Sequence, residues 1–498
     1  MAAPGFDPKA VAGKYPLPDR HVEVLVIGAG PAGIAAAVAA ARDGAEVLLI
    51  DENPVGAGLM GLDTPLYYGG RYTGAVQTKP RMLEQVFGAK PDLEAAIEAG
   101  VDVQLGVYAW GTWVPGEALA ALPAPVAGLA DDETSWMVGF DRLILATGAR
   151  DVAFAFPGWD QPGVMGARGL AALIDTYDAF AGRRLAILGS GDLALETALH
   201  ALEKGLDVVA LIEIGETAQG SADLIARVVR AGVPILTRTV PVRVDGGLDG
   251  VERLTVRDLT DGVEQTLECD TVVQAVAVTP VIELLDVLGA ARAMQTRKGG
   301  HAPVSPDGVA TSLSVLTLAG DVAGIVSLPR DSVAYQQAWM RALIAAADGD
   351  VVVCQCEDVT REALLAVRQP TYLGPPSPGM ARRRLAGLLQ DGPVNQDQIK
   401  RLTRACMGAC QARRCREQVA LTLACASNQS AEDIPLAGYR APVRPLPLCV
   451  LAAWDEARDM TANWDVWFGI PGQWVPYADI GTEREALHEG MFGGDMHL

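Results

Sequence analysis

The sequence predicts an α/β protein in which one dinucleotide-binding domain is inserted into another, followed by a small cysteine-rich domain. Three observations lead to this fold class. A strand, glycine-turn, helix pattern occurs twice, at residues 21–51 and again at 184–213. Strands that fit the first domain lie on both sides of the second copy, at 140–145 and 315–319. Five of the eight cysteines fall within residues 354–415.

Length and composition limit the possible functions. A chain of 498 residues is long enough for two to four domains. A net charge of −21 argues against nucleic acid as a partner. The first twenty residues lack the apolar core of a secretory signal, and no apolar run is long enough to predict a transmembrane segment. We expect a cytoplasmic protein, with peripheral attachment to the inner face of the membrane as the alternative.

The first glycine turn reads Gly28-Ala-Gly30-Pro-Ala-Gly33 and follows an apolar strand. The first glycine permits the tight turn, the second lets the backbone approach a pyrophosphate, and the third lets helix and strand pack closely. The helix that follows points its N-terminus at the phosphates. Asp51 ends the next strand, 23 residues after Gly28, where a carboxylate accepts hydrogen bonds from an adenosine ribose.

Two later motifs indicate which dinucleotide binds. One strand ends in Ala146-Thr147-Gly148 and another ends in Gly320-Asp321. Together with the first turn, they resemble the three ordered signatures of glutathione-reductase-like flavoproteins, which have two dinucleotide-binding domains. The resemblance implies that the Asp321 carboxylate binds the ribityl chain of a flavin, which nicotinamide cofactors lack. FAD is therefore the expected cofactor of the first domain.

The second glycine turn reads Gly189-Ser-Gly191-Asp-Leu-Ala194, and the strand after its helix ends at Glu213. A carboxylate at this place suits an unphosphorylated ribose and repels a 2′-phosphate, so NAD is expected rather than NADP. A domain with a purely structural role is the alternative. Residues 150–300 contain no Cys-x-x-Cys, which excludes a dithiol relay of the thioredoxin-reductase type.

Two cysteine pairs follow the flavoprotein body, Cys354-x-Cys356 and Cys410-x₄-Cys415. Such pairs can converge on one metal or cluster once the chain folds back. Cysteine thiolates hold [2Fe–2S] centres, and four of them also form closed structural zinc sites. The flavoprotein context favours iron–sulfur over zinc.

The surroundings of these pairs contain further candidates. Cys406 is a fifth thiol that can replace Cys410 as a ligand, whereas Cys425 and Cys449 lie in apolar runs and are predicted to be buried core residues. Thr360 is expected to cap a helix, and a second short helix is expected at 395–404.

The segments CQCEDVT, IKRLTRACMGACQARRC and RAPVRPLPLCVLA resemble the bacterioferritin-associated-ferredoxin-like [2Fe–2S] module. The resemblance is to that module as fused to the large, flavin-containing (alpha) subunit of heteromeric amine and amino-acid dehydrogenases. These include opine oxidases, hydrogen cyanide synthase, dye-linked proline dehydrogenase and, more distantly, heterotetrameric sarcosine oxidase. The resemblance covers roughly residues 20–450. It implies that the cluster ligands are Cys354, Cys356, Cys410 and Cys415.

The predicted domains are 1–150 and 301–350 for the two parts of the FAD-binding domain, 151–300 for the inserted NAD-type domain, 351–430 for the [2Fe–2S] domain, and 431–498 for a C-terminal tail. The tail holds Trp454, Trp464, Trp467 and Trp474, and an aromatic concentration of this kind fits a subunit interface.

Little sequence remains for a substrate-binding domain, and none of the five histidines is paired with a nucleophile. The resemblance therefore implies an electron-transfer subunit of a dehydrogenase or oxidase that acts on a C–N bond. The expected partners are a second FAD-containing subunit that oxidises the substrate, a small ferredoxin-like subunit, and a quinone or other acceptor. An FMN shared with a partner subunit is a further expected cofactor. The alternatives are a self-contained NADH-dependent ferredoxin-reductase-like flavoprotein and a zinc-containing scaffold without catalytic function.

Overall fold

The computed structural model describes residues 18–55, 71–116, 122, 124–325, 331–347, 350–453 and 482–484. The chain divides into two compact units, Met1–Pro447 and Leu448–Leu498. In the second unit the short helix α15 (Leu448–Ala452) is described, whereas the four tryptophans predicted to form an interface lie outside the described residues. No helix among the described residues is long and apolar enough to span a membrane.

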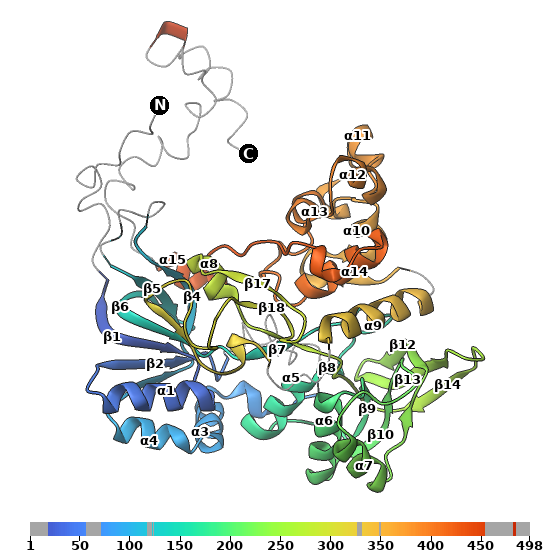
Figure 1. Cartoon of the computed structure of the whole chain (residues 1–498), viewed down its shortest axis with the longest axis horizontal. Helices are drawn as coiled ribbons and strands as arrows, with labels where there is room; N and C mark the ends of the chain where they lie inside the picture. The colour runs from blue at the N-terminus through green and yellow to red at the C-terminus, as the bar shows by residue number, and fades with distance from the viewer. Residues whose placement is uncertain are drawn as a thin grey trace. The chain divides into compact units, whose positions relative to one another are not determined.

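The first unit begins with a sheet that contains the first glycine turn (Figure 1). Its parallel strands are β3 (Asp102–Leu105), β2 (Val47–Asp51), β1 (Arg20–Ile27), β6 (Ser135–Leu145) and β19 (Leu316–Leu318). Strands β4 (Tyr108–Trp113) and β5 (Val126–Ala130) extend it as an antiparallel meander that pairs with the start of β6. Strand β19, which is remote in sequence, thus joins the same sheet as β1.

Both faces of this sheet are buried, which explains why its strands are almost continuously apolar. Val24 and Val26 face helices α1 (Pro31–Arg42) and α4 (Asp92–Glu98). Leu25 and Ile27, one residue out of step, face the meander and helix α8 (Glu283–Leu288). Helix α3 (Lys79–Ala89) precedes α4. The carboxyl ends of β1 and β2 are left for a ligand at the point where the strand order reverses.

A second parallel sheet has the order β11 (Ile235–Leu236), β10 (Asp207–Ile212), β9 (Arg184–Leu188), β15 (Thr271–Gln274) and β8 (Val164–Gly166). Helices α5 (Ala167–Ala171), α6 (Asp192–Glu203) and α7 (Ala222–Arg230) accompany it. Leu185 and Ile187 face α6, and Ala186 and Leu188 face the core on the opposite side. An antiparallel meander of β12 (Thr239–Gly247), β13 (Gly250–Asp258) and β14 (Glu264–Glu268) covers that side.

The chain passes between the two sheets twice, through the paired strands β7 (Ala149–Asp151) and β16 (Val278–Pro280). Strands β17 (Arg292–Gln295) and β18 (Gly300–Pro303) form a separate hairpin. Helix α9 (Ser332–Ala346) then packs against β12 and against a helix of the cysteine-rich module (Figure 1). The result is a mixed α/β fold with two Rossmann-like sheets.

The cysteine-rich module is mainly helical and is drawn in orange in Figure 1. It contains the strands β20 (Val352–Cys354) and β21 (Val359–Thr360) and the helices α10 (Arg361–Leu365), α11 (Pro378–Ala381), α12 (Leu385–Asp391), α13 (Gln396–Thr403) and α14 (Arg416–Ser427). The predicted cap is confirmed, because the Thr360 hydroxyl accepts a hydrogen bond from Ala363 N at 3.1 Å. The short helix expected at 395–404 is also confirmed as α13, with Asn395 as its cap.

Candidate cofactor sites

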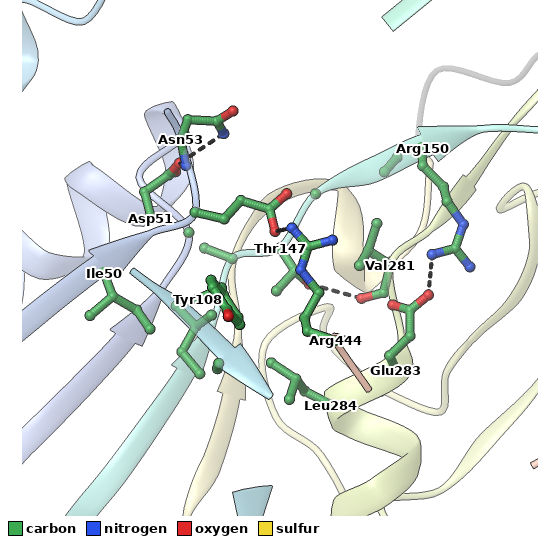
Figure 2. A pocket seen from close by; sticks show the side chains of 18 of the residues that line it. Ile50, Asp51, Asn53, Tyr108, Thr147, Arg150, Val281, Glu283, Leu284 and Arg444 are labelled. Atoms are coloured by element: carbon green, nitrogen blue, oxygen red, sulfur yellow. Dashed lines mark hydrogen bonds and ion pairs between the residues drawn. The ribbon is translucent and has the colours of Figure 1, made fainter. Parts of the chain in front are cut away.

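A cleft of about 410 Å³ opens at the carboxyl ends of β1, β2 and β6. Gly28, Gly30, Asp51, Thr147 and Gly148 all line it. Five of the residues that the sequence assigns to FAD therefore share one cavity. Figure 2 shows Asp51 and Thr147 on facing sides of this space.

The glycine turn is shaped by contacts that exclude side chains. Gly28 has φ = +109°, and a Cβ there would lie 2.3 Å from the carbonyl oxygen of Ala146. A Cβ on Gly33 would lie 1.9 Å from the Gly28 carbonyl oxygen. A Cβ on Gly30 would meet no atom within 4 Å. The first and third glycines thus hold β1, β6 and α1 together, and the second leaves room for a phosphate.

Asp51 is positioned by the glycine turn itself. Its carboxylate accepts hydrogen bonds from Ala29 N at 2.6 Å and Asn53 N at 2.8 Å. Lys90 Nζ is 3.4 Å from the same carboxylate, and both residues line the cleft. Asp51 is thus a carboxylate oriented by backbone donors at the edge of an open cavity, as a ribose site requires.

The motif at Gly320-Asp321 lies outside the lining of the cleft. Gly320 approaches α1 closely, since a Cβ there would lie 2.9 Å from the Ala32 Cβ. The half-exposed Asp321 carboxylate accepts a hydrogen bond from Arg168 Nη2 at 2.7 Å, and Asp321 is not part of the cleft lining, whereas Arg168 is. The contact that the sequence predicts between Asp321 and a ribityl chain remains a prediction.

Three residues that the sequence analysis did not select complete the cleft, and all come from beyond the second Rossmann-like domain: Arg413, Val443 and Arg444. Arg444 is buried, forms an ion pair with Glu52, and has its guanidinium carbon 5.7 Å from the centre of the Tyr108 ring. Figure 2 shows this side chain extending between Tyr108 and Thr147. Val443 N donates to Trp110 O at 2.7 Å and fixes the segment against β4.

A buried ionic network forms part of the wall of the cleft. Arg150 pairs with Glu283, and its Nη2 donates to the Tyr439 hydroxyl at 3.0 Å (Figure 2 shows the first pair). Burial opposes charge on both partners of the ion pair, yet the Arg150 guanidinium holds the pKa of Glu283 below its usual value. Glu417, in α14 of the cysteine-rich module, lies 3.5 Å from Arg150 Nη2. The network therefore ties that module to the cleft.

The structure brings five cysteine side chains together in the module. Cys415 Sγ lies 3.7 Å from Cys354 Sγ and 3.5 Å from Cys406 Sγ. Hydrogen bonds from Cys356 and Cys415 lower the pKa of Cys410 well below its usual value, with Arg414 acting in the same direction. All four predicted ligands are thus mutual neighbours, and Cys406 adjoins them.

Cys406 has φ = +71° and is buried, with Gln396 Nε2 3.8 Å from its sulfur. No group of three or more histidine, cysteine, aspartate or glutamate side chains in the described ranges is arranged to hold a metal ion. Cysteines bind a metal ion or cluster as thiolates, so binding at this group would be accompanied by loss of the thiol protons. Of the two cysteines predicted to be core residues, Cys425 is partly buried, but Cys449 is exposed, so that prediction was wrong for Cys449.

The second Rossmann-like domain also borders a cavity, of about 720 Å³, and Gly191 and Asp192 line it. Gly189 adopts φ = +105°, as Gly28 does in the first domain. Glu213 differs from Asp51, because it is fully buried and does not line the cavity. Its carboxylate accepts hydrogen bonds from Ser190 Oγ at 2.5 Å, Gly215 N at 2.7 Å and Tyr335 Oη at 2.6 Å.

A family model described as pyridine nucleotide-disulphide oxidoreductase matches residues 22–349, which include both glycine turns. The chain belongs to this family. Membership agrees with the two Rossmann-like sheets and with the cleft formed by Gly28, Gly30 and Asp51. The chain is therefore a flavin-dependent oxidoreductase, and the fit of the cleft to a dinucleotide supports FAD as its cofactor.

Relatives within this family agree with the resemblance seen in the sequence. An opine oxidase subunit of Agrobacterium tumefaciens (strain Ach5) is 25% identical over 474 residues, covering 86% of this chain and 91% of that protein. The alpha subunit of sarcosine oxidase from Corynebacterium sp. (strain P-1) is 29% identical over 289 residues, covering 56% of this chain but 28% of that protein. The L-proline dehydrogenase from P. horikoshii has the same fold, with a TM-score of 0.56 at 20% identity, covering 86% of this chain and 79% of that chain.

Two of the residues that the sequence did not identify as part of these sites lie inside recognisable sequence segments. Arg413 lies inside the CQARRC segment, and Arg444 lies inside RAPVRPLPL, but both segments were used only for their resemblance. Tyr335 gave no signal, since a tyrosine in an apolar helix is ordinarily a core residue.

Proposed function

We propose that this chain is the electron-transfer flavoprotein and iron–sulfur subunit of a heteromeric dehydrogenase or oxidase that oxidises a C–N bond. The substrate is an amine, an amino acid or an opine. A second FAD-containing subunit takes the electrons from that bond, and a shared FMN and a small ferredoxin-like subunit complete the assembly. Electrons pass between the flavin and a [2Fe–2S] centre held by Cys354, Cys356, Cys410 and Cys415, and leave to a quinone or another acceptor.

The observation that carries this proposal is the position of Arg413. Its side chain lines the same cleft as Gly28 and Thr147, and its backbone N and side-chain Nε donate to the carbonyl oxygen of Cys410 at 3.2 and 3.3 Å. A single residue therefore touches the flavin cleft and a proposed cluster ligand. Bound FAD supplies both two-electron and one-electron chemistry there.

The charge around the cysteines supports an anionic centre. Residues 351–430 contain 11 arginines and lysines against 6 aspartates and glutamates, in a chain whose net charge is −21. Four of these arginines are buried, namely Arg361, Arg413, Arg414 and Arg416. Buried cations are costly unless a compensating negative charge lies nearby. Arg413 and Arg414 lie beside Cys410, where thiolates around an iron–sulfur cluster would supply that charge. Arg361 and Arg416 instead face Asp350 and Glu417. Nearby charges and hydrogen bonds set the potential of such clusters.

The alternative function, a self-contained NADH-dependent reductase, needs a working nicotinamide site in the second domain. The cavity beside Gly191 favours it, but the buried Glu213 has no face left for a ribose. The subunit function is therefore preferred.

Two preparations test the proposal. One is the purified full-length chain, and the other is the complex that co-purifies with an affinity-tagged chain. Dithionite is expected to bleach the flavin and to give the EPR signal of a reduced [2Fe–2S] centre. Cys410→Ser should abolish or alter that signal, whereas Cys425→Ser, at a cysteine outside the group, should leave it unchanged. In the complex, proline, sarcosine or an opine should reduce the same centres anaerobically. Zinc in place of iron, or flavin that no such substrate reduces, would contradict the proposal.

A further inference from the structure

We infer that the second Rossmann-like domain is closed to nicotinamide nucleotides, and that Tyr335 of α9 closes it by taking the place of the ribose at Glu213. The family to which the chain belongs is named for pyridine nucleotides. The inference is that the second domain of this chain does not bind the nucleotide for which the family is named. The inference concerns the second domain alone and needs neither the cluster nor a partner subunit.

Most of the acceptor capacity of the Glu213 carboxylate is already used by the protein. A carboxylate that binds a ribose must offer its oxygens to two hydroxyl groups. One Glu213 oxygen accepts from Gly215 N, and the other accepts from both Ser190 Oγ and Tyr335 Oη, at 2.5–2.7 Å. The side chain is 0% exposed. A ribose hydroxyl therefore has no path to this carboxylate, and three of its roughly four acceptor positions are already taken.

Tyr335 is itself fixed in this position. Its ring packs edge-on against Trp339, with 6.3 Å between the ring centres. Burial and the adjacent Glu213 carboxylate raise the pKa of the Tyr335 hydroxyl well above its usual value, so the hydroxyl stays a donor. Tyr335 also forms part of the wall of the 720 Å³ cavity, between that space and Glu213.

The part of the cavity that remains suits a dinucleotide poorly. A Cβ on Gly191 would meet no atom within 4 Å, so the glycine turn itself is open. However, the lining contains the carboxylates of Asp192, Glu196 and Asp331. Among the described residues that line it, the only arginine is Arg168, which pairs with Asp321. An anionic pyrophosphate would thus enter a site with an excess of negative charge.

The closure also has a structural role, because α9 continues into the contact with the cysteine-rich module. Gln337 Nε2 donates to Gln429 O at 2.7 Å, and the Thr422 hydroxyl lies 3.7 Å from Met340 Sδ. Helix α9 therefore connects the second domain to the cysteine-rich module. Its Tyr335 contacts Glu213, and its Gln337 and Met340 contact the module. A nucleotide that displaced Tyr335 would have to shift α9 and disturb the module.

Binding of NAD⁺ and NADH to the full-length flavoprotein tests the inference. Thermal-shift and isothermal titration with millimolar nucleotide should show no saturable binding to the unaltered chain, and NADH should not bleach its flavin. Tyr335→Ala, which uncovers Glu213, should bind NAD⁺ at least tenfold more tightly than the unaltered chain. Tyr372→Ala removes a tyrosine that hydrogen-bonds to Glu357 outside this cavity, and it should gain nothing.

Saturable binding of NADH to the unaltered chain, or its reduction by NADH, would overturn the closure. Equal absence of binding in the unaltered chain and in Tyr335→Ala would overturn the role of Tyr335. If Tyr335→Ala fails to fold, Tyr335→Leu fills part of the space but removes the ring and the hydroxyl that cover Glu213, and it must also bind NAD⁺ more tightly than the unaltered chain for the inference to stand. Failure of the subunit function would instead appear as missing cluster or substrate reduction, which these titrations do not measure.

Discussion

The two Rossmann-like domains have the same local motif but different surroundings. Asp51 ends β2 and Glu213 directly follows β10, and each accepts a backbone hydrogen bond from the residue two positions later in the chain. Asp51 faces an open cleft, whereas Glu213 is sealed by Tyr335. A glycine turn and a strand-end acid thus specify the fold of a Rossmann-like domain. Segments that are remote in sequence, such as α9 with Tyr335, decide whether its nucleotide site is open.

The largest expected difference concerns the glycines of the first domain. Gly33→Val should abolish flavin retention and lower expression of folded protein, because a Cβ there would lie 1.9 Å from a backbone oxygen. The matched control is Gly88→Ala in α3, whose added Cβ meets no atom within 4 Å and which lies outside the cleft lining, so that it should keep both the fold and the flavin. The measurement is the ratio of flavin to protein absorbance after gel filtration. Equal flavin content in the two variants would contradict the close packing at Gly33.

Removing the two acids one at a time should affect the two domains differently. Asp51→Asn should release flavin, because it weakens an acceptor in the open cleft. Glu213→Gln should keep its flavin but lose about 1–3 kcal/mol of stability, because a buried acceptor is replaced and its donors lose a charged partner. Flavin content and the thermal midpoint separate these outcomes. Loss of flavin in Glu213→Gln would mean that the second domain supports the first more directly than its contacts indicate.

A smaller effect is expected at Arg444. Arg444→Ala removes the ion pair with Glu52 and a contact with the Tyr108 ring, so flavin should bind roughly tenfold more weakly, equivalent to about 1.4 kcal/mol. Arg238→Ala removes an exposed pair with Glu216 in the second domain and should have almost no effect. Fluorescence titration of the flavin-depleted chain with FAD measures the difference. An unchanged affinity in Arg444→Ala would remove the C-terminal segment from the cofactor site.

A further effect of similar size is a pH dependence expected at the first cleft. Burial raises the pKa of Asp151 from 3.8 to about 6, against the opposing hydrogen bonds from Arg168 N and Gly169 N. The protonated form favours folding, so its contribution is complete below about pH 4 and is lost as the pH rises through 6. The full shift corresponds to about 3 kcal/mol, which partial exposure to the cleft reduces to about 1–2 kcal/mol.

Asp151→Asn tests this, because the amide stays neutral at every pH. Relative to the variant, the unaltered chain should lose about 1–2 kcal/mol of stability between pH 4 and pH 7, measured as the difference in thermal midpoints across that range. A difference that does not change with pH would show that this carboxyl group titrates normally in the folded protein.

Local patterns were sufficient to predict much of this molecule. Both glycine turns, the cap at Thr360 and the helix that follows Asn395 follow from neighbours in sequence. The gathering of the four cysteines was expected from their paired spacing and from the family resemblance. The closure of Glu213 does not, because its partner Tyr335 is 122 residues away. The third wall of the flavin cleft was missed for the same reason, since Arg413 and Arg444 arrive from the far end of the first unit. Side-chain partners that meet only through tertiary packing leave no periodic or motif signal.

The pairing of Glu52 with Arg444 sets an order on the biosynthesis of this protein. The two residues are 392 positions apart in the chain. At translation rates of about 5–20 residues per second, roughly 20–80 s separate their emergence from the ribosome. During that interval the nascent chain has a glycine turn but an incomplete cofactor cleft. Full affinity for flavin must then follow folding of the cysteine-rich module, so a chain terminated before Arg444 would leave the ribosome with a weaker cofactor site.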